Sequence, residues 1–216
     1  MLTFAEEILI LLLGDRDGEL FTCVPGDNLS CALAGAVLLD LSFAGRVDTD
    51  PERLVVIDPT PTGNVILDGT LARLAARDPQ VSTRIWIGEL SVEDAAGIRE
   101  SVLQSLVDRD VLASRGGRFR WTDFFSRPPG GGSEAEREVK GRIRDVLFSD
   151  GIPDPRDIAL VGLTDACDLI GYVLPNEDMN RYRPRLDQLR GLDLIARELA
   201  ELLAGIEHHV TNVRVR

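Results

Sequence analysis

The pattern of apolar and polar residues predicts a mainly helical protein. Apolar side chains fill almost every position of residues 2–13 and of residues 28–45, so we expect two helices that the rest of the chain covers on all sides. Thr3 and Glu6 have the spacing of a capping box at the start of the first helix. Asp40 is the one charged side chain inside the second helix, and a carboxylate buried there needs a partner.

The remaining helices are predicted from a weaker periodicity of apolar residues. They are expected over residues 65–76, 81–90, 91–108, 133–148, 157–174, 179–191 and 192–209. Ser91 and Ser133 are the predicted N-caps of two of them. Residues 53–58 are predicted to form a short strand with 46–49 as its candidate partner, and residues 14–20 a turn. No repeat or domain boundary interrupts the pattern, so residues 1–216 are expected to form a single domain.

The predicted helix over residues 91–108 carries an arginine in an unusual place. At 100° per residue its apolar positions form one stripe with Arg99 in the middle. The stripe consists of Val92, Ala95, Val102, Leu103 and Leu106. A guanidinium on a core face must be paired or must point into a pocket. Two interpretations follow: a structural ion pair with Asp40 or Glu7, or an arginine that binds an anion.

Residues 111–129 combine positive charge with aromatic rings. Four arginines oppose the single acid Asp123, whereas the whole chain carries a net charge of −12. The arginines are Arg115, Arg118, Arg120 and Arg127, and the rings are Phe119, Trp121, Phe124 and Phe125. Gly116 and Gly117 supply the positive φ angles of a tight turn, which predicts a β-hairpin over about 111–121. The Pro- and Gly-rich residues 127–133 are expected to form a mobile loop.

Three roles are open for this segment. The rings could cover the core and leave the arginines in solvent. They could instead contact a protein partner or another copy of the chain, where Arg, Trp and Phe are favoured anchors. They could also enter a bilayer interface while the arginines meet lipid phosphates. The candidate contact residues are Phe119, Trp121, Phe124 and Phe125, and the candidate anion-binding residues are Arg99, Arg115, Arg118 and Arg120.

The composition excludes some classes of protein. The chain is 44% hydrophobic and 28% charged, as in an ordinary globular domain, and no apolar run reaches the roughly 18 residues of a membrane span. A net charge of −12 argues against binding of nucleic acid or anionic lipid over the whole protein surface. It still allows a local basic patch that binds an anion. Cys23, Cys31 and Cys167 are interpreted as reduced core residues of a cytoplasmic protein. Lys140 is the only lysine, a bias typical of high-GC bacterial genomes.

The residue patterns of common catalytic sites are missing. The sequence has no phosphate-binding glycine loop, no nucleophile elbow and no zinc-binding histidine motif. His208 and His209 are adjacent, and adjacent side chains on a helix point apart. Asp40, Asp165 and Asp168 lie in apolar helices, where paired structural roles are commoner than general-base catalysis. We therefore expect a non-enzymatic protein that needs no metal or cofactor.

Five segments match a known family in their order and spacing. They are LTFAEEILILLLGDRDG, ALAGAVLLDLSFAGRV, PTGNVILD, SLVDRDVL and DACDLIGYVL. Through them the chain resembles the Golgi phosphoprotein 3 family from about Leu2 to about Leu203. The family fold is mainly α-helical, with central apolar helices ringed by amphipathic helices and one projecting β-hairpin. The resemblance implies a peripheral membrane or adaptor protein that binds phosphatidylinositol 4-phosphate.

The resemblance also implies which residues meet the lipid headgroup. Family members use a tryptophan, an arginine on the second helix and two arginines one turn apart on a later helix. Arg99 matches one of the paired arginines, whereas Ala96, Ala34 and Pro25 occupy the other three positions. Each arginine–phosphate contact contributes roughly 1.5–3 kcal/mol, so headgroup affinity is expected to be weakened or altered. The family hairpin takes part in self-association and in seating at membranes.

Two alternatives stand beside binding to an anionic phospholipid headgroup. The first is a protein-interaction module that associates into homo-oligomers through the hairpin. The second is a winged-helix nucleic-acid binder, because an arginine-rich hairpin follows a helix. The overall charge and the acids Glu93 and Glu100 on that helix argue against the second alternative, so no nucleic acid is expected as a partner.

Overall fold

The computed structural model describes residues 1–16, 19–23, 26–50, 52–77, 81–126, 132–175, 177–190 and 192–201. The helices are α1 (Phe4–Leu12), α2 (Gly26–Phe43), α3 (Val65–Ala75), α4 (Thr83–Glu89), α5 (Ala95–Asp108), α6 (Glu134–Phe148), α7 (Pro155–Ala166), α8 (Ile170–Val173) and α9 (Met179–Leu189). A π-helical turn, η1 (Leu90–Asp94), joins α4 to α5, and residues 194–201 are helical again. The strands are β1 (Leu13–Arg16), β2 (Glu19–Thr22), β3 (Val47–Thr49), β4 (Leu54–Val56), β5 (Leu112–Arg115) and β6 (Arg118–Trp121).

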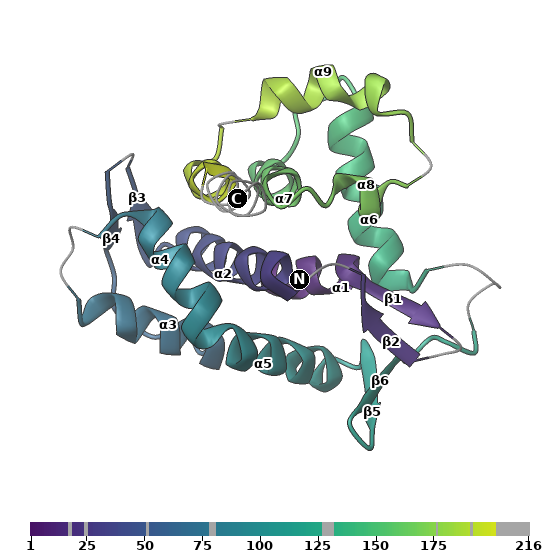
Figure 1. The fold of residues 1–216 in the computed structure, drawn as a ribbon, viewed down its shortest axis with the longest axis horizontal. Helices are drawn as coiled ribbons and strands as arrows, with labels where there is room; N and C mark the ends of the chain where they lie inside the picture. The colour runs from purple at the N-terminus through teal and green to yellow at the C-terminus, as the bar shows by residue number, and fades with distance from the viewer. Residues whose placement is uncertain are drawn as a thin grey trace, which may run out of the picture.

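α1 and α2 form the centre of the protein, and the predicted mainly helical domain is confirmed (Figure 1). Figure 1 shows α3 and α5 on one side of this centre and α7 and α9 on the other. Every residue of α1 is buried, and α2 is in contact with α1, α3, α4, α5 and α7. The predicted capping box is confirmed, because Glu6 N donates to Thr3 Oγ1 (3.1 Å) and Thr3 N donates to Glu6 Oε2 (2.7 Å).

Small residues allow the central helices to approach closely. A methyl group added at Gly35 in α2 would lie 3.0 Å from side-chain carbons of Leu163 and Leu199. One added at Gly162 in α7 would lie 3.2 Å from Cβ of Ala196. The interior is close-packed, so these glycines set the distance between α2, α7 and the helical residues 194–201.

Within the described ranges the strands form three antiparallel pairs, β1–β2, β3–β4 and β5–β6. The predicted pairing of residues 46–49 with 53–58 is confirmed by β3–β4, and the predicted hairpin over about 111–121 by β5–β6. The turn predicted over 14–20 is wrong in part, because most of that segment lies in the strands β1 and β2. β2 lies against β6, so the two hairpins are neighbours (Figure 1).

Two predicted helices have different boundaries in the structure. α4 continues through η1 into α5, so Ser91 is inside a continuous helix and its Oγ donates to Gly88 O (2.8 Å) rather than capping. The helix predicted over 157–174 is interrupted at Asp168, whose φ of 55° separates α7 from α8. Ser133 is an N-cap as predicted, since Glu136 N donates to its Oγ (3.0 Å). Residues 127–131 of the predicted mobile loop lie outside the described residues.

Candidate functional site

The β5–β6 hairpin gathers three arginines on one face. Its register pairs Arg115 with Arg118 and Ala113 with Arg120. Side chains of directly opposed residues point to the same side of a sheet, and residues two apart on one strand share a side. Arg115, Arg118 and Arg120 therefore lie together on one face, and all three are exposed. We call these residues the arginine face.

The opposite face of the hairpin packs on the protein. Leu112 is paired with Trp121, and both side chains are buried, with 1% of each residue exposed. Phe119 is partly buried against the same core. Trp121 is therefore a core residue, which corrects its assignment to the contact set. Strand alternation explains the difference, because placing the arginines outward turns the tryptophan inward.

The other two aromatic candidates follow the hairpin. Phe124 is partly buried against the core, and its ring makes an edge contact with Phe125 at 5.1 Å between centroids. Phe125 is 84% exposed. Phe125 is thus the aromatic candidate most open to an external contact, and it lies close in sequence to the arginine face.

The arginine face carries little compensating negative charge. Arg118 Nε lies 3.4 Å from Glu19 Oε1 of the neighbouring hairpin, an exposed ion pair. The Arg120 guanidinium carbon is 6.0 Å from the centroid of the Phe124 ring. Among the described residues, Arg115 has no ion-pair partner, and it stands directly opposite Arg118. Like charges in directly opposed positions destabilise a hairpin, so this arrangement is a local cost that an anionic ligand would relieve.

Arg99 is exposed on α5, which corrects its predicted place on a core face. The buried residues of α5 are Ile98, Val102, Leu103 and Leu106, whereas Val92 of the predicted stripe is 82% exposed. Arg99 lies in the same regular helix as the buried Val102, Leu103 and Leu106, so the helical wheel does not separate it from them, and the elements that pack on α5 leave its position uncovered. The expected partners of Arg99 are also wrong, since Asp40 and Glu7 pair with Arg156 and, within the described residues, Arg99 has no ion-pair partner.

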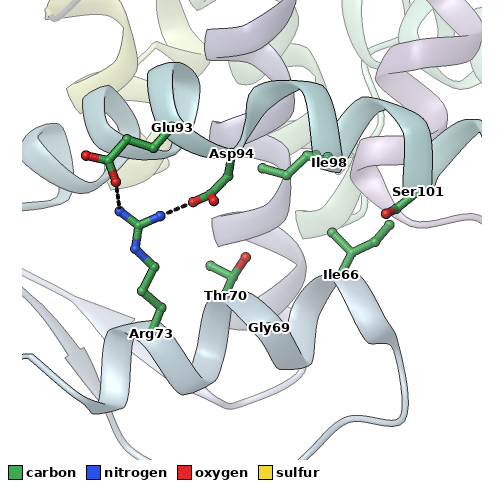
Figure 2. Close-up of a pocket in the computed structure, with 9 residues that line it drawn as sticks. Ile66, Gly69, Thr70, Arg73, Glu93, Asp94, Ile98 and Ser101 are labelled. Carbon is green, nitrogen blue, oxygen red and sulfur yellow. Dashed lines mark hydrogen bonds and ion pairs between the residues drawn. The ribbon is translucent and has the colours of Figure 1, made fainter.

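The other positions implied for headgroup contact do not form a charged pocket. Ala34 is fully buried in α2, Ala96 is exposed on α5, and Pro25 lies outside the described residues. A pocket of about 340 Å³ lies between α3 and the start of α5 (Figure 2). Its one guanidinium, Arg73, is held by Glu93 and Asp94, so it offers no free cation to a phosphate.

A buried charged cluster lies at the start of α1, and sequence reasoning named Asp40 and Glu7 as acids that could pair with an arginine but did not identify the arginines that they meet. Asp40 accepts hydrogen bonds from the backbone N–H groups of Phe4 (2.9 Å) and Ala5 (3.2 Å). Burial raises the pKa of Asp40 to about 7, against the lowering effect of these two hydrogen bonds and of Arg156. The prediction that Asp40 needs a partner is confirmed, but its partners come from α1 and α7.

Two further buried acids complete this cluster. Glu6 Oε1 lies 3.0 Å from Arg109 Nε and accepts from Ser105 Oγ (2.6 Å). Glu7 accepts from Arg142 (2.8 Å) and Arg156 (3.2 Å). Every carboxylate of the cluster is thus engaged in holding helices together.

The three cysteines lie in two kinds of environment. Cys31 and Cys167 are buried as predicted, but Cys23 is exposed, which corrects its assignment to the core. Burial raises the pKa of the Cys31 and Cys167 thiols. In the described part of the chain, no three His, Cys, Asp or Glu side chains are grouped to hold a metal ion. Among the same residues, no helix is both long enough and apolar enough to cross a bilayer.

Comparison with known proteins places the chain in a family. Residues 4–206 match the family described as Golgi phosphoprotein 3 (GPP34). The chain is 30% identical over 179 residues to vacuolar protein sorting-associated protein 74 of Eremothecium gossypii, an alignment that covers 74% of this chain and 51% of that protein. The chain therefore spans about half the length of this curated relative. With its central apolar helices and its β5–β6 hairpin, this protein belongs to the Golgi phosphoprotein 3 family.

Proposed function

We propose that this protein is a non-enzymatic binding module that docks on anionic membrane surfaces through the arginine face of its β5–β6 hairpin. The observation that carries the proposal is the placement of Arg115, Arg118 and Arg120 on one exposed face of an otherwise acidic protein. Phe125 adds an exposed ring that can enter the interface beside these cations. Membership of the Golgi phosphoprotein 3 family supports the same class of function.

The proposed module prefers negative surface charge over one particular headgroup. Phosphatidylinositol 4-phosphate binding in the family uses four side chains, and Arg99 alone matches them here, with Ala34 and Ala96 at two of the other positions. In the pocket between α3 and α5, the guanidinium of Arg73 is already paired with Glu93 and Asp94. Dispersed contacts of exposed arginines with lipid phosphates each contribute about 1 kcal/mol, which suits weak, reversible and salt-sensitive docking.

Liposome co-sedimentation at low salt tests this proposal. The vesicles contain phosphatidylcholine alone, phosphatidylcholine with phosphatidylserine, or phosphatidylcholine with phosphatidylinositol 4-phosphate. The wild type should bind both charged vesicles, and Arg115→Ala with Arg120→Ala should weaken binding roughly thirtyfold, at about 1 kcal/mol for each arginine. Phe125→Ala should weaken binding further. Trp121 is left unchanged because its removal would open the core.

A matched control separates the hairpin from overall charge. Arg53→Gln with Arg84→Gln removes two partly exposed arginines elsewhere on the surface and should leave vesicle binding intact. No sedimentation with any vesicle would overturn the proposal, as would equal losses in the hairpin and control variants. A different outcome is that Arg99→Ala reduces binding only to the vesicles that contain phosphatidylinositol 4-phosphate. That result would show that this protein still recognises the headgroup at the site used by the family.

Association between copies through the same hairpin is a second candidate function. It is favoured by the ring of Phe125, which is 84% exposed and joined to Phe124 in an aromatic pair, because such rings are favoured anchors of protein contacts. Sedimentation velocity without lipid distinguishes it from membrane docking. A dimer or larger species that Phe125→Ala dissociates would favour association, and a monomer at all concentrations would leave membrane docking as the hairpin's function.

A further inference from the structure

The pocket between α3 and the start of α5 has no part in the proposed membrane contact. Its volume is about 340 Å³, which lies within the roughly 300–1,000 Å³ that is typical of small-molecule sites. Figure 2 shows it between the facing sides of the two helices. The family headgroup positions on α5, Ala96 and Arg99, are not among the residues that line it. The pocket is therefore a separate candidate site.

Two glycines keep this pocket open. Gly69 of α3 and Gly97 of α5 both line it, and a methyl group added at either position would meet nothing within 4 Å. Glycine is an unfavourable residue inside a helix, and close packing does not require it at these two positions. The facing helices therefore leave room for a ligand between them.

A buried hydroxyl group faces the pocket without a partner. Thr70 is only 7% exposed and lines the pocket, and its Oγ1 forms no hydrogen bond with any of the described residues. Figure 2 shows its side chain directed towards α5. Thr164, a buried threonine in α7, instead donates to Leu160 O (2.6 Å) within its own helix. Buried polar groups normally have a hydrogen-bond partner, so the position of Thr70 favours a ligand that supplies one.

The unpaired oxygen atoms of the pocket favour a ligand that donates hydrogen bonds. Arg73 donates to Asp94 Oδ2 and Glu93 Oε2, so Asp94 Oδ1 and Glu93 Oε1 remain without a donor among the described residues. The hydroxyl group of Ser101, which also lines the pocket, is likewise unpaired within the described ranges. An ammonium group has three donors and no acceptor, so it matches these oxygen atoms.

The charge of the pocket also favours a cation. Two carboxylates, Glu93 and Asp94, and one guanidinium, Arg73, line it, so its net charge is −1. Arg77 lies one turn further along α3 and is held by Glu89, so it adds no free positive charge. A phosphate or carboxylate ligand would therefore meet repulsion, whereas an ammonium group would neutralise the site.

The rest of the lining is suited to a short alkyl chain. Ile98 is 5% exposed and Ile66 is partly buried, and both side chains line the pocket. In Figure 2 the charged residues lie at one end of the pocket, and Ile66 and Ser101 lie at the other. The lining thus changes from charged to apolar along the pocket, with a hydroxyl group at the apolar end.

We propose that the pocket between α3 and α5 binds a small alkylammonium compound. The ammonium group donates to Thr70 Oγ1 and to the free carboxylate oxygens of Glu93 and Asp94, and the alkyl chain contacts Ile66 and Ile98. A lysine side chain of a partner protein carries the same ammonium chemistry, so the test includes it as a separate probe.

Saturation-transfer difference NMR on the whole chain at low salt and neutral pH tests this proposal. The main probe is aminopentanol, which has an ammonium group, a short alkyl chain and a terminal hydroxyl group. Pentanediol lacks the charge, and hydroxypentanoate reverses it. Aminopentanol should bind, pentanediol should bind at least about tenfold more weakly, and hydroxypentanoate should not bind. No vesicle is present, so the outcome is independent of membrane docking.

Variants locate the binding to this pocket. Gly97→Leu fills the pocket with a side chain and should abolish binding of aminopentanol, and leucine is favoured over glycine inside a helix. Gly141→Leu is the matched control, because it makes the same change at an open glycine of α6, and it should leave binding intact. Thr70→Val keeps the shape of the side chain without its hydroxyl group and should weaken binding about tenfold.

Four results would overturn the proposal. The first is no binding of aminopentanol by the wild type. The second is equal binding of pentanediol, which would exclude a role for the ammonium group. The third is an equal loss in Gly97→Leu and Gly141→Leu. The fourth is much tighter binding of acetyl-lysine amide that Gly97→Leu abolishes, which would assign the pocket to a side chain of a partner protein. Circular dichroism of each variant verifies that it is folded.

Discussion

Single residues of this protein differ in their ionisation because their surroundings differ. Asp40 is largely buried in α2, and its two backbone hydrogen bonds do not offset the loss of water around the carboxylate, so its pKa rises to about 7. Asp68, by contrast, is more exposed and accepts hydrogen bonds from Thr62, and its pKa is lowered. An aspartate in α2 thus makes stability depend on pH, whereas an aspartate in α3 holds the preceding loop.

The raised pKa of Asp40 predicts how stability depends on pH. The unfolded chain ionises this group near its ordinary value, whereas the folded protein retains the proton up to about 7. The stabilising contribution is therefore complete below about pH 4 and is lost as pH rises through about 7, by up to about 4 kcal/mol. Urea unfolding at about pH 5 and about pH 8 should show a larger free energy of unfolding at the lower pH.

Asp40→Asn provides the control for this pH effect. Asparagine cannot ionise, so the variant should lose most of the difference between the two pH values, whatever its fixed effect on stability. An unchanged difference in Asp40→Asn would show that other groups cause it. Such a result would also mean that Asp40 is ionised throughout this range.

At the scale of single elements, the helices differ in how closely they are packed around their glycines. Gly35 in α2 faces Leu163 and Leu199 with no room for a methyl group, whereas a methyl group at Gly141 in α6 would meet nothing within 4 Å. Both glycines lie inside helices, where alanine is intrinsically favoured by about 1 kcal/mol. Substitution at Gly141 therefore measures helix propensity alone, whereas substitution at Gly35 also measures tertiary packing.

Alanine substitution at these two glycines should have opposite effects. Gly141→Ala should raise the free energy of unfolding by about 0.5–1 kcal/mol, because it removes backbone entropy from the unfolded chain. Gly35→Ala should lower it by about 1–3 kcal/mol, because the added methyl group forces two leucines to move. Thermal or urea unfolding measures both. Stabilisation by Gly35→Ala would mean that α2, α7 and residues 194–201 are less tightly packed than in the structure.

At the scale of the whole molecule, arginines connect helices that are distant in sequence. Arg156 of α7 donates to Leu2 O (2.8 Å) and to Glu7 Oε2 (3.2 Å), and its guanidinium carbon lies 3.9 Å from the centroid of the Phe4 ring. Its side chain is 15% exposed. One residue thus joins α7 to the beginning of α1 and, through Asp40 at 4.0 Å, to α2.

Removing Arg156 should destabilise the protein strongly. Arg156→Gln leaves Glu7, which is buried, with one cation fewer, and breaking a buried pair typically costs about 3–5 kcal/mol. Chemical unfolding should show a loss of this order, together with a further rise in the pKa of Asp40 because a nearby positive charge has gone. Arg53→Gln, which removes an exposed pair with Asp50, should change stability by less than about 1 kcal/mol. Similar losses in both variants would contradict this role for Arg156.

The distribution of charge also belongs to the whole molecule. A chain with a net charge of −12 presents an arginine-rich surface on the β5–β6 hairpin. A strongly acidic background limits non-specific attraction to anionic partners, so local basic surfaces can act selectively. This contrast in charge is the basis for the proposed membrane contact.

The sequence by itself determined the features that depend on local chemistry. The apolar segments predicted α1 and α2, Thr3 and Glu6 predicted the capping box, and Gly116 with Gly117 predicted the hairpin turn. The family followed from the order of five short segments. Each of these features depends on residues close together in the chain, so their spacing is enough to predict them.

Tertiary structure alone decided the features that depend on packing between distant segments. Trp121 faces the core because its side of the hairpin packs on the protein. Arg99 is exposed although it shares α5 with the buried Val102 and Leu106, because packing of neighbouring elements decides which positions are covered. The partners of Asp40 come from α1 and α7. These contacts form only when the helices pack around a shared core, so the spacing of residues within one segment does not predict them.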